Sequence, residues 1–238
     1  MSVLEGKTAI VVGGGRGLGR SIALAFARQG ADLVIASRTE SEIRKVADEL
    51  RALGHAGVLA VKTDATDYEQ ANSMVRRTVQ EFGRVDVLVN CQGTALIKPT
   101  IQTTVEDWSR IIDGNLTSVF YTCRAVLPQM LNQKSGHIIN ISSRAGVTGA
   151  DRVAAYSAAK AGVIGLSKAL AQELKSENIK VNVICPAPMD TPMRWKSTPQ
   201  FYPNKAMKPD YVAEFVVLIA SMSDIVVEDV LIPASINY

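Results

Sequence analysis

The sequence predicts an α/β protein built on a doubly wound, mainly parallel sheet with helices on both faces. Seven short segments are rich in Val and Ile and almost continuously apolar. Such segments are typical of strands that are buried on both faces of a parallel sheet. Segments of helical character alternate with these strands along the chain, as expected for repeated βαβ units.

We expect the seven strands at 8–12, 32–36, 58–62, 85–89, 137–141, 180–184 and 229–233. The helices are expected between them, at 17–29, 40–53, 67–82, 104–131, 155–176 and 209–221. No linker, repeat or low-complexity stretch interrupts this alternation, so a single domain is expected over residues 1–238. The Pro-rich stretch 186–209 is expected to be a long loop, with residues 192–208 as a lid over the substrate.

The composition is that of a globular protein with balanced charge. The chain is 47% hydrophobic and 21% charged, and its net charge of +3 argues against nucleic acid as a partner. No apolar run reaches the roughly 18 residues of a membrane span, and the first residues lack the layout of a secretion signal. Cys91, Cys123 and Cys185 form no CxxC pair and no metal-ligand spacing. An odd number of cysteines suits a reducing compartment, so we expect a cytoplasmic protein without a metal site.

A glycine cluster, GGGRGLG at 13–19, follows the first strand and opens the first helix. Glycine lets the backbone come close to a ligand, and a helix N-terminus offers free N–H groups to a pyrophosphate. The glycines fit Gly13-x-x-x-Gly17-x-Gly19 and not the common dinucleotide fingerprint GxGxxG. The cluster indicates a nucleotide site, although by itself it also fits a tight turn between a strand and a helix.

The second strand ends without the acidic residue that holds the ribose 2′-hydroxyl in NAD-binding folds. Ser37 and Arg38 stand there instead, and Arg16 lies in the glycine turn. An arginine can bind a 2′-phosphate through two parallel hydrogen bonds, whereas a carboxylate would repel it. Either arginine alone is also consistent with a solvated surface, but together they favour NADP(H) over NAD(H).

Tyr156 and Lys160, in the segment YSAAK, share one face of the helix expected at 155–176. A free tyrosine has a pKa of about 10, and a nearby lysine ammonium favours the phenolate and lowers that pKa. The pair is therefore a candidate proton donor with a neighbour that tunes it. Chance alone also produces such pairs, so the interpretation needs the other motifs.

Together these motifs resemble those of the short-chain dehydrogenase/reductase family, in the single-domain branch that includes the 3-oxoacyl-acyl-carrier-protein reductases. The resemblance is close from residue 5 to about 194 and looser beyond. Besides the glycine turn it rests on TDATD around Asp64, NCQG at 90–93, PAPMDT at 186–191, and the spacing of Ser143 and Tyr156, 156 − 143 = 13. It implies a Rossmann-type fold.

The resemblance also implies the site residues. The catalytic set is Asn115, Ser143, Tyr156 and Lys160, in which Ser143 binds the carbonyl oxygen, Lys160 also holds the nicotinamide ribose, and Asn115 holds a water that links the lysine to solvent. Ser142 is the less favoured of the two adjacent serines. The implied cofactor contacts, besides Tyr156 and Lys160, are Gly13, Gly15, Arg16, Gly17, Leu18, Gly19, Ser37, Arg38, Asp64, Ala65, Asn90, Gly93, Pro186, Ala187, Met189 and Thr191.

Gly114 and Asn115 are unusual inside the helix expected at 104–131, since both residues cost helix stability. A kink or bulge that frees a backbone carbonyl would explain their presence. The alternative is a helix that breaks in two at 113–114.

Several positions depart from the family pattern. Val12 lacks the hydroxyl of the usual threonine, and Cys91 and Gln92 replace small residues beside the cofactor. Ala187 replaces a glycine and would be strained at a positive φ. The C-terminal EDVLIPASINY lacks the glycine-rich ending on which tetramer contacts are usually built.

We therefore expect an NADPH-dependent oxidoreductase that interconverts a ketone and a secondary alcohol, with Tyr156 as acid and base. The alternatives are an NAD-dependent alcohol dehydrogenase of the same fold and a non-catalytic NADP-binding protein. Apolar and aromatic residues in 93–99 and 192–208 suggest a small-molecule substrate with a hydrophobic portion; an acyl thioester, a steroid-like ketone and a small diketone all fit. In the family, helices like those at 104–131 and 155–176 form dimer faces, so a homodimer or homotetramer is expected.

Overall fold

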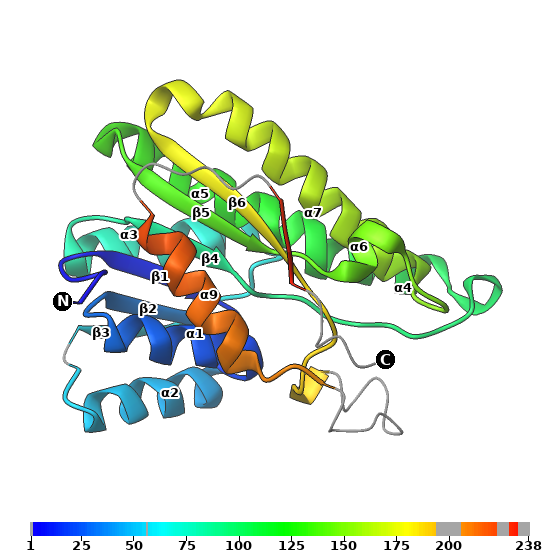
Figure 1. The fold of residues 1–238 in the computed structure, drawn as a ribbon, viewed down its shortest axis with the longest axis horizontal. Helices are drawn as coiled ribbons and strands as arrows, with labels where there is room; N and C mark the ends of the chain where they lie inside the picture. Colours follow the sequence, from blue (N-terminus) through cyan, green and yellow to red (C-terminus); the bar gives the residue numbers. More distant parts are fainter. Residues whose placement is uncertain (1, 56, 194–205, 223–228, 233–238) are drawn as a thin grey trace.

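The structure, a computed structural model, describes residues 2–55, 57–193, 206–222 and 229–232. One sheet runs through it in the order β3-β2-β1-β4-β5-β6-β7, and all neighbouring strands are parallel (Figure 1). The strands are β1 (Thr8–Val12), β2 (Asp32–Ser37), β3 (Val58–Lys62), β4 (Val87–Asn90), β5 (Gly136–Ile141), β6 (Ile179–Pro186) and β7 (Asp229–Ile232). This order is that of the doubly wound Rossmann arrangement, and the predicted fold class is confirmed.

Helices cover both faces of the sheet (Figure 1). One face carries α1 (Gly17–Arg28), α2 (Glu40–Ala52) and α9 (Pro209–Ser221). The other carries α3 (Tyr68–Phe82), α5 (Ser118–Gln133) and α7 (Ala154–Glu173). The shorter helices α4 (Val105–Ile112) and α6 (Arg144–Thr148) belong to the connections after β4 and β5. In the part of the chain that the structure describes, no helix combines the length and the apolar character needed to cross a membrane.

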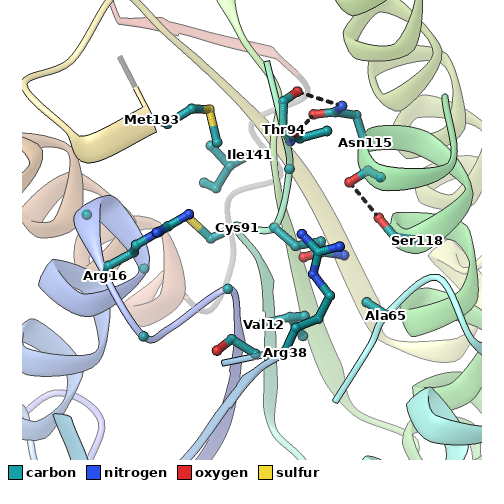
Figure 2. A pocket seen from close by; sticks show the side chains of 18 of the residues that line it. Val12, Arg16, Arg38, Ala65, Cys91, Thr94, Asn115, Ser118, Ile141 and Met193 are labelled. Atoms are coloured by element: carbon teal, nitrogen blue, oxygen red, sulfur yellow. Dashed lines mark hydrogen bonds between the residues drawn. The ribbon is translucent and has the colours of Figure 1, made fainter. Parts of the chain in front are cut away.

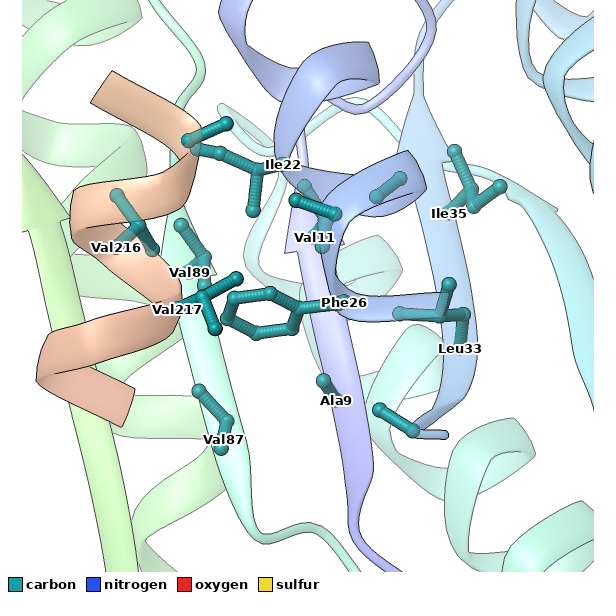
Figure 3. Packing of buried hydrophobic residues seen from close by; sticks show 14 of the residues in the cluster. Ala9, Val11, Ile22, Phe26, Leu33, Ile35, Val87, Val89, Val216 and Val217 are labelled. Carbon is teal, nitrogen blue, oxygen red and sulfur yellow. The ribbon is translucent and has the colours of Figure 1, made fainter. Parts of the chain in front are cut away.

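The strands β1 to β6 send side chains into two separate cores, one on each face of the sheet. Val11 of β1 packs with Phe26 of α1 and Val217 of α9 on one face (Figure 3). Its neighbour Ile10 belongs to the core on the opposite face. Both sets are apolar because both faces are covered, which explains the continuous apolar strands in the sequence. Burial of one such large side chain stabilises the fold by about 1.5–3 kcal/mol.

The segment expected as one helix at 104–131 contains a bulge. It consists of α4, a π-helical turn η2 (Asp113–Thr117) and α5, which follow one another without a break. The bulge predicted from Gly114 and Asn115 is confirmed, and the alternative of two separate helices is wrong. The expected lid at 192–208 lies largely outside the described residues, except for Pro192, Met193 and residues 206–208.

His137 is a buried histidine on β5, with only 6% of its surface exposed. Its Nε2 lies 2.6 Å from Oδ1 of Asn182 on the neighbouring strand β6. Burial lowers the pKa of His137 to about 4; the contact with Asn182 raises it and the charge of Lys180 lowers it further. The folded protein therefore keeps this ring neutral at pH values where the unfolded chain, with a histidine pKa of about 6.5, binds a proton.

This difference predicts acid sensitivity. The contribution of the neutral His137 to stability is complete above pH 6.5 and is lost as the pH falls from 6.5 toward 4. Because of this group, we expect the free energy of unfolding to be about 2 kcal/mol lower at a pH of about 4.5 than at neutral pH. Urea titrations across this pH range should give a flatter profile for His137→Gln than for the wild type. His55→Gln is the control, and identical profiles in all three proteins would contradict the assignment.

Candidate active site

A cavity of about 500 Å³ opens at the carboxyl edge of the sheet, a volume suited to a small-molecule ligand. Residues that follow β1, β2, β4 and β5 line it, and α4, η2 and α7 supply further walls (Figure 2). The sheet order reverses between β1 and β4, and ligands of open α/β sheets bind at such a reversal.

The glycine turn forms one wall of the cavity. Gly13 has a φ of 79°, and a Cβ there would lie 2.8 Å from the backbone N of Gln92. Only glycine therefore allows the turn to pack against the segment after β4. The helix α1 begins at Gly17, and no side chain caps its first N–H groups. Gly17, Leu18 and Gly19 line the cavity, so this helix end fits a pyrophosphate.

Arg16 and Arg38 both line the cavity (Figure 2). Arg16 forms an exposed ion pair with Glu42, at 3.2 Å between Nη1 and Oε1. Among the described residues, Arg38 forms no ion pair, and Figure 2 shows its side chain extending into the pocket. The guanidinium of Arg38 can therefore bind a ligand without first breaking an ion pair with a carboxylate of the described residues.

Other expected cofactor contacts complete the lining. Asp64 and Ala65 follow β3, and Oδ1 of Asp64 accepts hydrogen bonds from N and Oγ1 of Thr66 at 3.0 and 2.7 Å. These bonds fix the carboxylate at the wall. Met189 and Thr191, after β6, also line the cavity, and a Cβ at Gly17 would lie 3.4 Å from Cγ2 of Thr191.

Tyr156 and Lys160 lie together in the wall that α7 provides. The Nζ of Lys160 is 5.9 Å from the centre of the Tyr156 ring and donates a hydrogen bond to the Ile141 carbonyl at 2.9 Å. Burial lowers the pKa of Lys160 to about 8, although the Cys91 and Cys185 thiols act in the opposite direction. The lysine still carries its proton at neutral pH, so a positive charge lies beside the phenol.

Asn115 joins η2 to the segment after β4. Its Nδ2 donates to the carbonyls of Ile111 and Thr94, at 2.8 and 2.9 Å, and its Oδ1 accepts from the Thr94 N–H at 3.2 Å. The side chain is fully buried. A Cβ at Gly93 would lie 2.6 Å from Oδ1 of Asn115 and 3.6 Å from Nζ of Lys160. The absence of a side chain at Gly93 therefore lets these two groups approach one another.

The two adjacent serines have different contacts. Ser142 lines the cavity, but its hydroxyl is buried and donates to the Lys160 carbonyl at 2.8 Å. Ser143 lies outside the lining, and its Oγ accepts the Ala145 N–H at 3.1 Å as the cap of α6. A hydroxyl that accepts still has a proton to donate, so the cap leaves Ser143 able to bind a carbonyl oxygen.

Three expected cofactor residues also lie outside the lining. Asn90 is fully buried between β4, β5 and α5; it donates to Oδ1 of Asn140 at 2.8 Å and accepts from Oγ1 of Thr122 at 2.7 Å. Pro186 ends β6, and Ala187 is 3% exposed. Ala187 is not among the described residues with positive φ, so the strain that the sequence suggested there is absent.

The cavity also contains residues that the sequence did not single out. Glu42, Thr94, Arg110, Asp113 and Ser118 belong to this group. One feature of the sequence indicated that Glu42 lies near the site. It stands in the first turn of a helix that follows the second strand, and such helices begin at the carboxyl edge of the sheet. Asp113 belongs to the π-helical turn η2, and Arg110 and Ser118 stand in the helices on either side of it, whereas Thr94 lies in the loop after β4.

The strand order and the glycine turn in the cavity wall are typical of dinucleotide-binding α/β proteins, and the comparisons with known proteins agree. The family model of short chain dehydrogenases matches residues 7–201. The chain therefore belongs to the short-chain dehydrogenase/reductase family and is an oxidoreductase.

Its relatives include named reductases. The chain is 39% identical over 192 residues to a 3-oxoacyl-[acyl-carrier-protein] reductase of Chlamydia muridarum, covering 81% of this chain and 77% of the relative. It is 37% identical over 214 residues to an uncharacterized oxidoreductase of Staphylococcus saprophyticus, covering 90% and 91%.

Two solved structures are similar over nearly the whole chain. The crystal structure of gox2181 matches with a TM-score of 0.91 and 31% sequence identity, and the match covers 97% of this chain and 95% of the gox2181 chain. A variant of actinorhodin polyketide ketoreductase with NADPH has a TM-score of 0.87 at 29% identity and covers 97% and 96%.

The close approach at Gly93 predicts a sharp effect of one methyl group. Gly93→Ala places a Cβ against the Asn115 side chain, which three hydrogen bonds hold in place. We expect a loss of about 1–3 kcal/mol in the free energy of unfolding. Gly165→Ala on α7 is the control, because a Cβ there meets nothing within 4 Å, and it should be neutral or stabilising by up to ~1 kcal/mol. Equal denaturation midpoints for the two variants would contradict this packing.

Proposed function

We propose that the protein is an NADPH-dependent carbonyl reductase that interconverts a ketone and a secondary alcohol. One observation carries the proposal: Tyr156 and Lys160 lie in the wall of the same cavity as the glycine turn. A nucleotide held by that turn would have its reactive end near a phenol and a buried ammonium. The substrate oxygen would then meet its proton donor at the point where the hydride is transferred.

The residues fit a nicotinamide dinucleotide. The turn at Gly13 and the start of α1 would hold the pyrophosphate, Asp64 and Ala65 the adenine, and Lys160 the nicotinamide ribose. When bound, the reduced nicotinamide supplies a hydride. Tyr156 donates the proton to the carbonyl oxygen, and Ser143 donates a hydrogen bond to the same oxygen as negative charge develops.

Lys160 and Asn115 support the proton donor. The Lys160 ammonium favours the phenolate of Tyr156 and so lowers the cost of giving up the proton. Asn115 lies beside Lys160 across Gly93 and would hold the water that returns a proton from solvent. The π-helical turn at Asn115 supports this role, because such turns occur frequently at functional sites.

Two alternatives remain distinct from this proposal. An NAD-dependent alcohol dehydrogenase would share the fold, but Arg16 and Arg38 disfavour it. A non-catalytic NADP-binding protein would have no need of a tyrosine beside a buried lysine. A screen of ketones and alcohols with both cofactors separates the three.

The substrate, assembly and location follow as further parts of the proposal. The substrate is a small carbonyl compound with a hydrophobic portion, and the names of the related reductases favour an acyl group. The protein assembles as a homodimer or homotetramer through α4, α5 and α7. None of the three cysteines forms a disulfide in the described structure, which fits a cytoplasmic protein.

The first test concerns the proton donor. Tyr156→Phe keeps the ring but removes the donor, so turnover should fall by at least ~10²-fold while NADPH binds nearly as before. Lys160→Ala should weaken both turnover and cofactor binding, because it removes the ribose contact and the charge that lowers the tyrosine pKa. Cofactor titrations and turnover of one working ketone decide it. Full activity of Tyr156→Phe would refute the proposed mechanism.

The second test concerns cofactor choice. Arg38→Asp removes a cation and adds a carboxylate that can bind a ribose 2′-hydroxyl. A charged hydrogen bond contributes about 1.5–3 kcal/mol, so its loss should weaken the binding of NADPH by roughly tenfold or more. Dissociation constants of NADPH and NADH before and after the change measure the shift. Tighter binding of NADH by the unmutated protein would show that the NADP(H) assignment is wrong.

The third test concerns assembly. Large apolar side chains are exposed on α4 and α5, among them Trp108 at 46% and Phe120 at 44%. A partner subunit would cover them, so Phe120→Glu should shift the protein toward monomer in light scattering. Leu53→Glu, at a residue that is 72% exposed after α2, is the control. A wild-type protein that is monomeric at micromolar concentration would refute the assembly.

A further inference from the structure

Glu42 is an acidic residue at the place where the proposed function requires positive charge. It lies in the first turn of α2 and lines the cavity together with Ser37 and Arg38. Its Oε1 accepts the hydrogen bond from Nη1 of Arg16 at 3.2 Å. One of the two arginines proposed to bind the cofactor phosphate is therefore already paired with a carboxylate of the same chain.

The glycine turn holds this carboxylate close to the cavity. A Cβ at Gly15 would lie 2.9 Å from Cβ of Glu42, 3.4 Å from its Oε2 and 3.2 Å from Oγ of Ser37. The Cβ of Glu42 is part of the stem of the side chain, so the backbone of α2 fixes its position. Rotation of the side chain can move the carboxylate by only a few ångströms, and it stays near the end of β2.

We propose that Glu42 limits the preference of the site for a 2′-phosphate. This inference rests on the proposed binding of NADP(H). A phosphate monoester carries a charge of about −1.5 to −2 at neutral pH. To bind it, Arg16 must leave Glu42, and the carboxylate then lies close to a second anion, where like charges repel. A ribose with a free 2′-hydroxyl has no charge there. Its binding therefore requires neither the loss of the Arg16–Glu42 ion pair nor the approach of a second anion.

Arg38 and Glu42 thus act in opposite directions on the same choice. Arg38 has no carboxylate partner among the described residues and attracts the phosphate, whereas Glu42 competes for Arg16 and opposes the phosphate. Both charges are partly exposed, so their effects are moderate and sensitive to salt. The site would favour the phosphorylated cofactor without excluding the other one.

The test compares two adenosine fragments in binding titrations of the full-length protein. Adenosine 2′,5′-bisphosphate carries the 2′-phosphate, and adenosine 5′-monophosphate lacks it. Glu42→Gln should bind the bisphosphate roughly three- to tenfold more tightly than the wild type. Binding of the monophosphate should change less than about twofold, since no second phosphate is repelled. The gain should shrink at high salt.

Glu40→Gln is the matched control. Glu40 lies in the same turn of α2 and loses the same charge, but it pairs with Arg44 and does not line the cavity. Unchanged or weaker bisphosphate binding by Glu42→Gln, or an equal gain in Glu40→Gln, would overturn the inference while leaving the NADP(H) proposal intact. A wild-type protein that does not prefer the bisphosphate would overturn both. Thermal denaturation of each variant checks that the fold is kept.

Discussion

A parallel sheet covered on both faces leaves one place for polar chemistry, the edge where its strands end. Here α1, α2 and α9 cover one face and α3, α5 and α7 the other, and most of the strand side chains beneath them are apolar. Residues that bind or react must therefore come from the loops after the strands or from helix ends that reach the same edge. The cavity follows this rule, because its lining includes residues that follow six of the strands, β1 to β6.

The buried lysine shows how closely the elements at this edge must pack. Lys160 is 4% exposed, and an isolated buried ammonium is costly unless polar groups surround it. The Ile141 carbonyl accepts a hydrogen bond from its Nζ, and a Cβ at Gly146 would lie 2.6 Å from the Lys160 backbone carbon. Small residues in α6 and α7 allow this contact. The packing that buries the Lys160 ammonium, at a cost in free energy, also places it beside Tyr156.

The sequence predicted the parts of the structure that depend on local pattern. Strands such as β1 and helices such as α9 have the expected bounds, because β1 is a continuous apolar run and a proline marks the start of α9. The bulge at Asn115 was also predictable, since glycine and asparagine disfavour a regular helix. The position of Glu42 after the second strand placed it near the carboxyl edge, but periodicity does not show how this side chain meets the loop at Gly15, which lies 42 − 15 = 27 residues earlier. The contact with Gly15 needs the three-dimensional arrangement.

The order of the strands has a consequence for how the chain is made. β1 lies inside the sheet between β2 and β4, but β4 begins only at Val87. At a synthesis rate of about 5–20 residues per second, one edge of β1 stays open for roughly 4–16 s after β1 itself leaves the ribosome. An unpaired apolar edge is prone to pair with other chains. The nascent N-terminal half, rather than the finished protein, is therefore the form with the greatest need of a chaperone.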